Sequence, residues 1–266
     1  MIAAYFGWGK TPFQKQILTH DLFQSEQFEE MQARLEFMIN QREFGLITGE
    51  VGAGKTTALR ALHDRLVSSE HVFLYLSDSS LKPRDFYREM LVQVGIEPMF
   101  LASDLKRQFK DALLDLYQNK EKTPIVVIDE AHLLSPTMLQ EIRFLTNFEI
   151  DSLSPLALIL VGQPELRDKI RLRSLDAISQ RITTRFHLVG LTYDEMKEYI
   201  DHHLKVAGET RQIFTEAAMK NIYMYTKGIL RLTNRLCTEC LLDCVARKEK
   251  LVDEDTVERV IADQRY

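Results

Sequence analysis

The chain has 266 residues, enough for one large domain or two modest ones. Hydrophobic residues make up 45% of it and charged residues 27%, as in a globular protein with a sizeable core. The formal net charge of −5 gives no overall attraction to nucleic acid, so DNA contacts would need a local basic patch. No apolar run approaches the roughly 18 residues of a membrane helix, and the N-terminal residues do not form a secretion signal. We therefore expect a cytoplasmic protein without a membrane contact.

Strands and helices are expected to alternate in the first two thirds of the chain. We expect helices at 27–40, 55–66, 83–94, 105–119 and 141–148, and strands at 44–48, 72–76, 124–130, 155–162 and 186–189. The runs at 124–130 and 155–162 are apolar without alternation, which is typical of strands buried on both faces of a parallel sheet. The pattern predicts an α/β core with right-handed crossovers.

The pattern changes after Gly190, where only helices are expected, at 193–206, 215–226, 230–246 and 254–262. Thr215 and Asp253 are candidate N-caps, and Gly208 and Gly228 are candidate helix stops. We therefore predict an α/β domain at 1–190 and a helical domain at 191–266.

A glycine-rich loop follows the first predicted strand. Residues 49–56 read Gly-Glu-Val-Gly-Ala-Gly-Lys-Thr, and a helix is expected to begin at Lys55. This arrangement binds a nucleoside triphosphate, because loop N–H groups and the helix N-terminus surround the phosphates. Lys55 would reach the terminal phosphates, and Thr56 would ligate Mg²⁺. The predicted ATP-binding residues of this loop are Gly49, Glu50, Val51, Gly52, Ala53, Gly54, Lys55, Thr56 and Thr57.

Two acidic residues end the strand predicted at 124–130. Asp129 would bind nucleotide by holding Mg²⁺ together with Thr56, and Glu130 would polarise the water that attacks the γ-phosphate. Paired with the glycine-rich loop, these acids predict an enzyme that converts ATP and water into ADP and phosphate.

Cysteines and histidines in the helical region are interpreted as structural. Cys237, Cys240 and Cys244 lie on one helical face, so we expect buried core residues rather than half of a zinc site. His202 and His203 point about 100° apart on a helix, and we expect both on its solvent side.

A phosphate-loop core followed by a helical lid resembles the AAA+ ATPases, over about residues 13–262. The wording at 48–57, 128–132, 161–166 and 179–182 is similar to the secretion-pathway ExeA-type ATPases and to the Mu B-type and TniB-type ATPases that accompany DDE transposases. The resemblance implies a P-loop (AAA+) parallel sheet core with a C-terminal helical lid bundle.

The resemblance also implies roles for single residues. Gln163 matches the sensor-1 position, where AAA+ members often carry Asn, Ser or Thr, and would contact the γ-phosphate or the attacking water. Arg181 matches the arginine finger given to a neighbouring subunit, and Arg185 competes with it for that role. Arg231 matches the sensor-2 arginine at the start of a lid helix. Phe13 and residues near Phe23 stand where such ATPases grip adenine, although an aromatic there could equally seal the sheet edge.

The task of the ATPase is inferred from the same resemblance. The secretion ATPases carry a transmembrane segment and a cell-wall-binding region after the AAA+ domain, and the sequence up to Tyr266 has neither. We therefore expect a cytoplasmic transposition target-selection or regulatory ATPase that self-assembles as a ring or filament on double-stranded DNA and meets a transposase. An ExeA-like secretion-related ATPase, a replication or repair initiator or clamp-loader-like ATPase, and an ATP-gated protein scaffold remain alternatives.

Two basic runs are candidate DNA contacts, because weak phosphate contacts repeated along an assembly add up. They are Lys106, Arg107 and Lys110, and Lys169, Arg171 and Arg173. A solvated helix face is the commoner explanation of such runs.

Overall fold

The computed structural model describes residues 1–78, 80–148 and 152–263. The chain divides into two compact units. The sheet unit comprises Gln27–Gly49 and Lys55–Leu188, and the helical unit comprises Met1–Glu26, Glu50–Gly54 and Val189–Tyr266. The N-terminal segment, which the sequence analysis assigned to the α/β domain, thus groups with the C-terminal helices.

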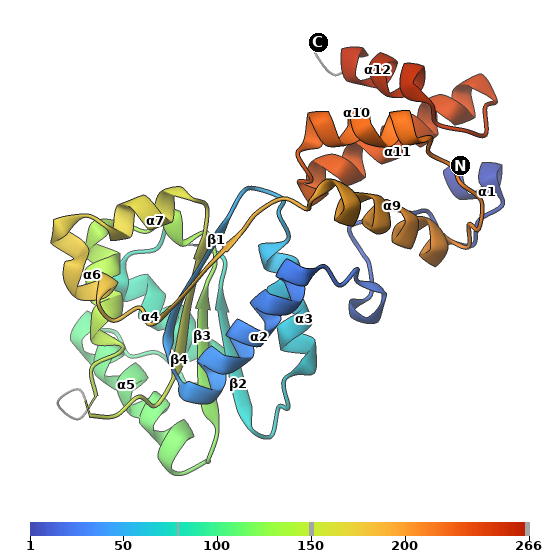
Figure 1. Cartoon of the computed structure of the whole chain (residues 1–266). Helices are drawn as coiled ribbons and strands as arrows, with labels where there is room; N and C mark the ends of the chain where they lie inside the picture. Colours follow the sequence, from blue (N-terminus) through green and yellow to red (C-terminus); the bar gives the residue numbers. More distant parts are fainter. Residues whose placement is uncertain (79, 149–151, 264–266) are drawn as a thin grey trace. The chain divides into compact units, whose positions relative to one another are not determined.

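Five parallel strands in the order β2-β3-β4-β1-β5 form the centre of the sheet unit (Figure 1). They are β1 (Phe44–Gly49), β2 (His71–Leu76), β3 (Thr123–Ile128), β4 (Ala157–Gly162) and β5 (Thr184–Leu188). Every residue of β1 and β4 is buried, as the continuous apolar runs predicted. The expected parallel α/β sheet is therefore confirmed.

Helices cover both faces of this sheet (Figure 1). One face carries α2 (Glu26–Gln41) and α3 (Lys55–Arg65), and the other carries α4 (Pro83–Val94), α5 (Ala102–Gln118), α6 (Pro136–Phe144) and α7 (Glu165–Ile170). Among the described residues, the unit also contains the short helical turns η2 (Ala131–Leu133), η4 (Arg173–Leu175) and α8 (Asp176–Ser179). Because side chains alternate along a strand, Val126 and Ile128 enter the core shared with α4, α5 and α6.

The helix expected at 141–148 begins and ends earlier than predicted. It is α6, which starts at Pro136, and the Ser135 side chain accepts a hydrogen bond from Met138 N. A serine N-cap followed by proline at the first helical position is a helix start signal, and it outweighs the apolar spacing further along the chain.

The helical unit contains α9 (Tyr193–Ala207), α10 (Glu216–Thr226), α11 (Leu230–Arg247) and α12 (Glu254–Asp263), with α1 (Ile2–Phe6) and η1 (Thr19–Asp21) from the N-terminal segment. Thr215 is the N-cap of α10, as predicted. Phe6, Trp8 and Phe13 belong to the core of this unit, and Trp8 Nε1 donates a hydrogen bond to the buried Glu209 at 2.8 Å. This burial explains why the N-terminal segment groups with the helices. Within the described residues, none of the helices is both long and apolar enough to cross a membrane.

The expectation that His203 lies on the solvent side of α9 is wrong. His203 is only 5% exposed, and its ring lies 5.2 Å from that of Phe13 and 4.5 Å from that of Tyr199. The N-terminal segment covers this face of α9, and the period of α9 alone does not reveal that cover. Burial, with a smaller contribution from the nearby His202, lowers the pKa of His203 to about 4.

We expect His203 to make stability fall in mild acid. Its folded-state pKa is below the unfolded value of about 6.5, so the unfolded chain binds more protons and unfolding becomes easier as the pH falls from about 6.5 towards about 4. The contribution changes by up to about 1.4 kcal/mol per pH unit. Urea unfolding across this range should show a steeper loss for the wild type than for His203→Gln. His20→Gln, which replaces an exposed imidazole, serves as the control variant. Parallel profiles for the wild type and His203→Gln would contradict the prediction.

Candidate nucleotide-binding site

The glycine-rich loop joins the end of β1 to the start of α3, as predicted. A Cβ atom on Gly49 would lie 2.5 Å from Leu188 O, so a side chain does not fit there. Gly52 has a φ of +85°, and a Cβ atom on it would lie 2.4 Å from Arg231 Cβ. Packing within each unit therefore leaves no room for a side chain at Gly49 or Gly52. The need for a bound phosphate to approach the backbone would be a second reason for glycine.

Lys55 is the first residue of α3 and is only 6% exposed. Its Nζ donates a hydrogen bond to Gly49 O at 2.6 Å. An ammonium group is costly to bury, so a lysine in this position needs oxygen partners. The contact holds a positive charge directly beside the loop.

The Asp129 carboxylate follows β3 and is 3% exposed. Thr56 Oγ1 donates to Asp129 Oδ2 at 3.1 Å, and Glu130 N donates to Asp129 Oδ1 at 2.8 Å. The structure thus brings together Thr56 and Asp129, the two residues predicted to hold Mg²⁺.

Tyr75 on β2 is a further partner of Asp129 that the sequence analysis missed. Its hydroxyl donates to Asp129 Oδ2 at 2.7 Å. Burial, together with the hydrogen bond and the charge of Asp129, raises the pKa of Tyr75 well above its usual value, so the hydroxyl keeps its proton. A tyrosine in an edge strand carries no sequence signal for this contact, which depends on the pairing of β2 with β3.

Glu130 stands in a left-handed backbone conformation, with φ 51° and ψ 31°. Such a conformation is uncommon for a residue with a side chain, and it turns Glu130 out of the line of β3. Gln163 Nε2 donates to Glu130 Oε2 at 3.5 Å, and His132 Nδ1 lies 3.6 Å from the same oxygen. The predicted base and the predicted sensor-1 residue are therefore neighbours, and His132 is an addition to the predicted set.

Arg231 lies in the first turn of α11, and its N–H donates to Gly52 O at 3.1 Å. Within the helical unit the start of α11 therefore contacts the loop at Gly52.

The two arginine-finger candidates have different surroundings in the sheet unit. Arg181 is half-buried, and its guanidinium donates to Arg143 O at 3.3 Å and to Thr146 Oγ1 at 2.7 Å, at the end of α6. Arg185 is exposed and donates to Ser179 O at 2.7 Å.

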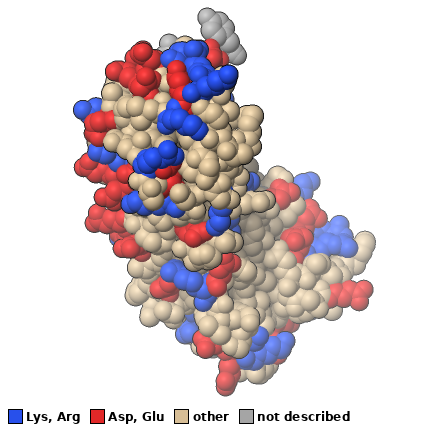
Figure 2. All heavy atoms as spheres, turned by 90° about the vertical axis from the view of Figure 1, so that its right-hand side faces the viewer, with Lys and Arg blue, Asp and Glu red and all other residues tan. Residues whose placement is uncertain are grey.

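The basic residues proposed for DNA contact differ in exposure. Three partly buried ammonium groups have partners in the sheet unit: Lys106 pairs with Glu141, Lys110 donates to Asn147 O, and Lys169 donates to His132 O and Leu134 O. Arg107, Arg171 and Arg173 are exposed, and two of them form surface ion pairs, Arg107 with Asp104 and Arg171 with Asp168. On the face of the molecule drawn in Figure 2, basic and acidic side chains are interspersed.

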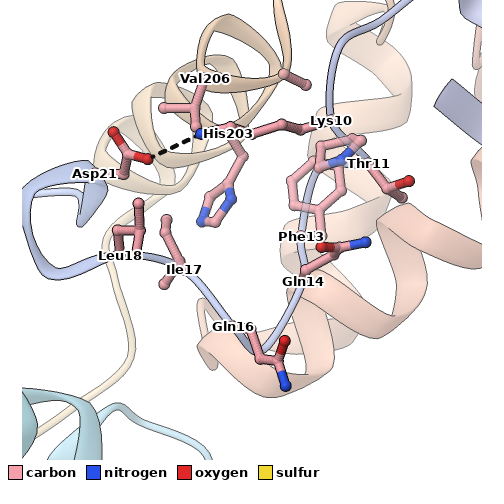
Figure 3. Close-up of a pocket in the computed structure, with 12 residues that line it drawn as sticks. Lys10, Thr11, Phe13, Gln14, Gln16, Ile17, Leu18, Asp21, His203 and Val206 are labelled. Atoms are coloured by element: carbon pink, nitrogen blue, oxygen red, sulfur yellow. Dashed lines mark hydrogen bonds and ion pairs between the residues drawn. The ribbon is translucent and has the colours of Figure 1, made fainter.

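Phe13 lines a cavity of about 180 Å³ within the helical unit (Figure 3). The cavity lies between the segment at 10–21 and α9, from which His203 points inward beside Phe13. The Phe13 ring is 6% exposed and contacts His203 and Phe214, so it packs in the core of the helical unit. Its proposed contact with adenine stays a prediction.

The three cysteines of α11 are buried, as predicted. Burial raises the pKa of Cys240 to about 12 and that of Cys244 to about 11, which leaves both thiols protonated. Among the described residues, no group of three or more His, Cys, Asp and Glu side chains is placed to hold a metal ion.

The residues around Asp129 suit Mg²⁺. A hydroxyl and a carboxylate, Thr56 Oγ1 and Asp129 Oδ2, lie 3.1 Å apart, and hard oxygen ligands of this kind are those that Mg²⁺ prefers.

The sheet order, the loop and the acidic pair together define a class of protein: the chain has the P-loop AAA+ fold. Residues 39–170 match the family model described as AAA domain. The expected AAA+ fold is therefore confirmed.

The chain is 34% identical over 261 residues to general secretion pathway protein A of Aeromonas hydrophila, covering 96% of this chain and 47% of that protein. It is 22% identical over 254 residues to an uncharacterised HTH-type transcriptional regulator of Methanocaldococcus jannaschii, covering 81% of this chain and 61% of the regulator. The chain thus spans only about half to three fifths of these relatives. The relation to a secretion-pathway protein is confirmed, and the relation to transposition ATPases stays a prediction.

Solved structures share the fold at low sequence identity. Drosophila ORC bound to DNA matches with a TM-score of 0.66 and 15% identity, covering 100% of this chain and 65% of that one. The Holliday junction branch migration motor RuvB of Thermotoga maritima matches with a TM-score of 0.60 and 17% identity, covering 94% and 72%.

Lys55→Ala should abolish nucleotide binding, a loss of at least about 100-fold, because it removes a charge-assisted contact to the phosphates. Titration of the protein with a fluorescent ATP analogue measures this. Lys122→Ala is the matched control, since Lys122 Nζ likewise donates to a backbone carbonyl, Ser68 O at 2.9 Å. Equal affinities for the two variants would contradict the assignment of Lys55.

Proposed function

We propose that this chain hydrolyses ATP in the cytoplasm and assembles on double-stranded DNA in an ATP-dependent way, as a transposition target-selection or regulatory ATPase. The ATPase part is supported by the cluster of Thr56, Asp129, Glu130 and Gln163. Thr56 Oγ1 lies 3.1 Å from Asp129 Oδ2, and Gln163 Nε2 lies 3.5 Å from Glu130 Oε2.

Each residue has a distinct part in the proposed reaction. Lys55 binds the terminal phosphates, and Thr56 and Asp129 hold Mg²⁺, which neutralises charge on the triphosphate when bound. Glu130 accepts a proton from the attacking water, and Gln163 orients either Glu130 or that water. Arg231 connects the loop to α11, so nucleotide binding can bias the helical unit.

DNA binding is supported by two observations. The first is a set of exposed arginines that are distant in sequence from Asp129 and Glu130, namely Arg107, Arg171 and Arg173. Two structural neighbours, Drosophila ORC and the ORC1 protein of Aeropyrum pernix, are seen with DNA. An assembly would repeat these weak contacts along the duplex, which suits a chain of net charge −5.

A secretion-related role is the second candidate, because general secretion pathway protein A is 34% identical over 96% of this chain. For that role, assembly would depend on nucleotide and a protein partner and would not require DNA. An initiator-like ATPase would share the DNA dependence, and only stimulation of a transposase would distinguish the transposition role from it.

Glu130→Gln should retain ATP and keep the protein in its assembled state, because it binds nucleotide but lacks the base. Mass photometry with ATP, with and without duplex DNA, tests the assembly. Growth into large particles only with both ligands supports the proposal. Assembly with ATP alone would contradict the dependence on DNA, and a monomer in every condition would contradict the proposed assembly.

The DNA contacts are tested in the same experiment with a charge-matched pair of triple variants. Arg107, Arg171 and Arg173 are replaced by Ala in one, and the exposed Lys15, Lys120 and Lys205 in the other. The arginine variant should lose DNA-dependent growth and reduce the salt dependence, whereas the lysine variant should behave as wild type. Equal DNA-dependent growth of the two triple variants would mean that other residues contact the DNA.

Arg181→Ala should reduce ATP turnover by roughly 10³-fold or more if Arg181 is the finger that completes a neighbour's site. Mixing it with Glu130→Gln should restore turnover, because an Arg181→Ala subunit keeps its base and receives Arg181 from the other variant. A mixture of Arg185→Ala with Glu130→Gln tests the competing residue, Arg185. Thermal unfolding serves as control, since Arg181 also contacts the end of α6. Rescue for Arg185→Ala alone would transfer the role to Arg185.

A further inference from the structure

The Asp129 carboxylate has a partner that the proposed catalytic roles do not use. Tyr75 OH donates to Asp129 Oδ2 at 2.7 Å, and Thr56 Oγ1 donates to the same oxygen at 3.1 Å. Asp129 Oδ1 accepts from Glu130 N. Three donors from three segments therefore fix the orientation of one carboxylate. A residue that orients a metal-holding carboxylate affects the affinity for the metal without touching it.

The strand that carries Tyr75 is at the edge of the sheet. β2 is the first strand in the order β2-β3-β4-β1-β5, so no other described strand pairs with its outer side. At Tyr75, the side chain of Gln93 near the end of α4 makes the main-chain hydrogen bonds that a neighbouring strand would make. Tyr75 N donates to Gln93 Oε1 at 2.9 Å, and Gln93 Nε2 donates to Tyr75 O at 2.9 Å.

The amide of Gln93 is itself held on α4. Its Nε2 also donates to Glu89 Oε1 at 3.1 Å, one helical turn earlier. The main chain of Tyr75 is thereby tied to α4, and the side chain of Tyr75 is tied to Asp129. The position of α4 is transmitted to the carboxylate through two short polar contacts.

We propose that Tyr75 is a positioning residue for Asp129, and that Gln93 makes this positioning depend on α4. The proposal rests on the proposed function, in which Asp129 holds Mg²⁺ for ATP. Helix α4 packs against α5, which carries the basic run Lys106, Arg107 and Lys110. A ligand that moves these helices would therefore change the metal affinity of the nucleotide site.

The test is the Mg²⁺ dependence of binding of a fluorescent, slowly hydrolysed ATP analogue. Tyr75→Phe should raise the Mg²⁺ concentration for half-maximal binding by roughly 10-fold, as expected when a partner of a metal-holding group is removed. In EDTA, Tyr75→Phe should bind the analogue as the wild type does, because the proposed effect of Tyr75 acts through Asp129 and therefore through the metal. An unchanged Mg²⁺ requirement in Tyr75→Phe would overturn the proposal.

Tyr193→Phe is a matched control outside α4. Tyr193 OH donates to Glu216 Oε1 at 2.6 Å, so this variant also loses a tyrosine-to-carboxylate hydrogen bond, within the helical unit. It should leave the Mg²⁺ requirement at the wild-type value. If Tyr193→Phe raised the requirement as much as Tyr75→Phe, the effect would be a general one of losing such a bond, and the proposal would be wrong.

Two double-variant cycles test the chain of contacts. Tyr75→Phe should have no further effect in an Asp129→Asn background, because it acts through that carboxylate. Gln93→Leu should raise the Mg²⁺ requirement in the wild type and add nothing to Tyr75→Phe. Additive effects in either cycle would overturn the proposed connection.

The result also separates this proposal from the proposed function. A wild-type protein that binds the analogue only with Mg²⁺, together with an unaffected Tyr75→Phe, would leave the ATPase proposal standing and remove the positioning role. A wild-type protein that binds no nucleotide would overturn both.

Discussion

The parallel pairing of β3, β4 and β1 is the constraint on which the nucleotide site depends. Ile128 pairs with Leu160, and Gly162 pairs with Thr48, so the three strands end at the same edge of the sheet. Asp129, Gln163 and Gly49 stand at or just beyond these ends. Parallel strands are joined by long crossover connections, so residues far apart in the sequence come together at this edge. A slip in the register of β3 would move Asp129 away from Thr56.

The backbone around the site is held in conformations that would be unfavourable elsewhere. Glu130 has a positive φ, and the contact from Glu130 N to Asp129 Oδ1 stabilises the turn that follows β3. Gly52 also has a positive φ and lies against Arg231. Contacts within the protein thus hold these residues in place. The middle of the glycine-rich loop groups with the helices, while its two ends continue into β1 and α3.

Charge in the site is arranged through hydrogen bonds more than through ion pairs. Asp129 is 3% exposed, and hydroxyl and N–H donors satisfy its carboxylate. Lys55 is 6% exposed and has a carbonyl oxygen as partner.

The sequence by itself determined the phosphate loop, the acidic pair and most strands and helices, because these depend on local spacing and on continuous apolar runs. The start of α6 could also have been read from Ser135 and Pro136, which form a local signal. Only the tertiary structure showed that Tyr75 and His132 join the site, that Arg181 contacts the end of α6, and that the N-terminal segment buries His203. These features are contacts between segments distant in sequence. The periodicity of one segment does not show which distant segment covers it, so these contacts could not be predicted from the sequence.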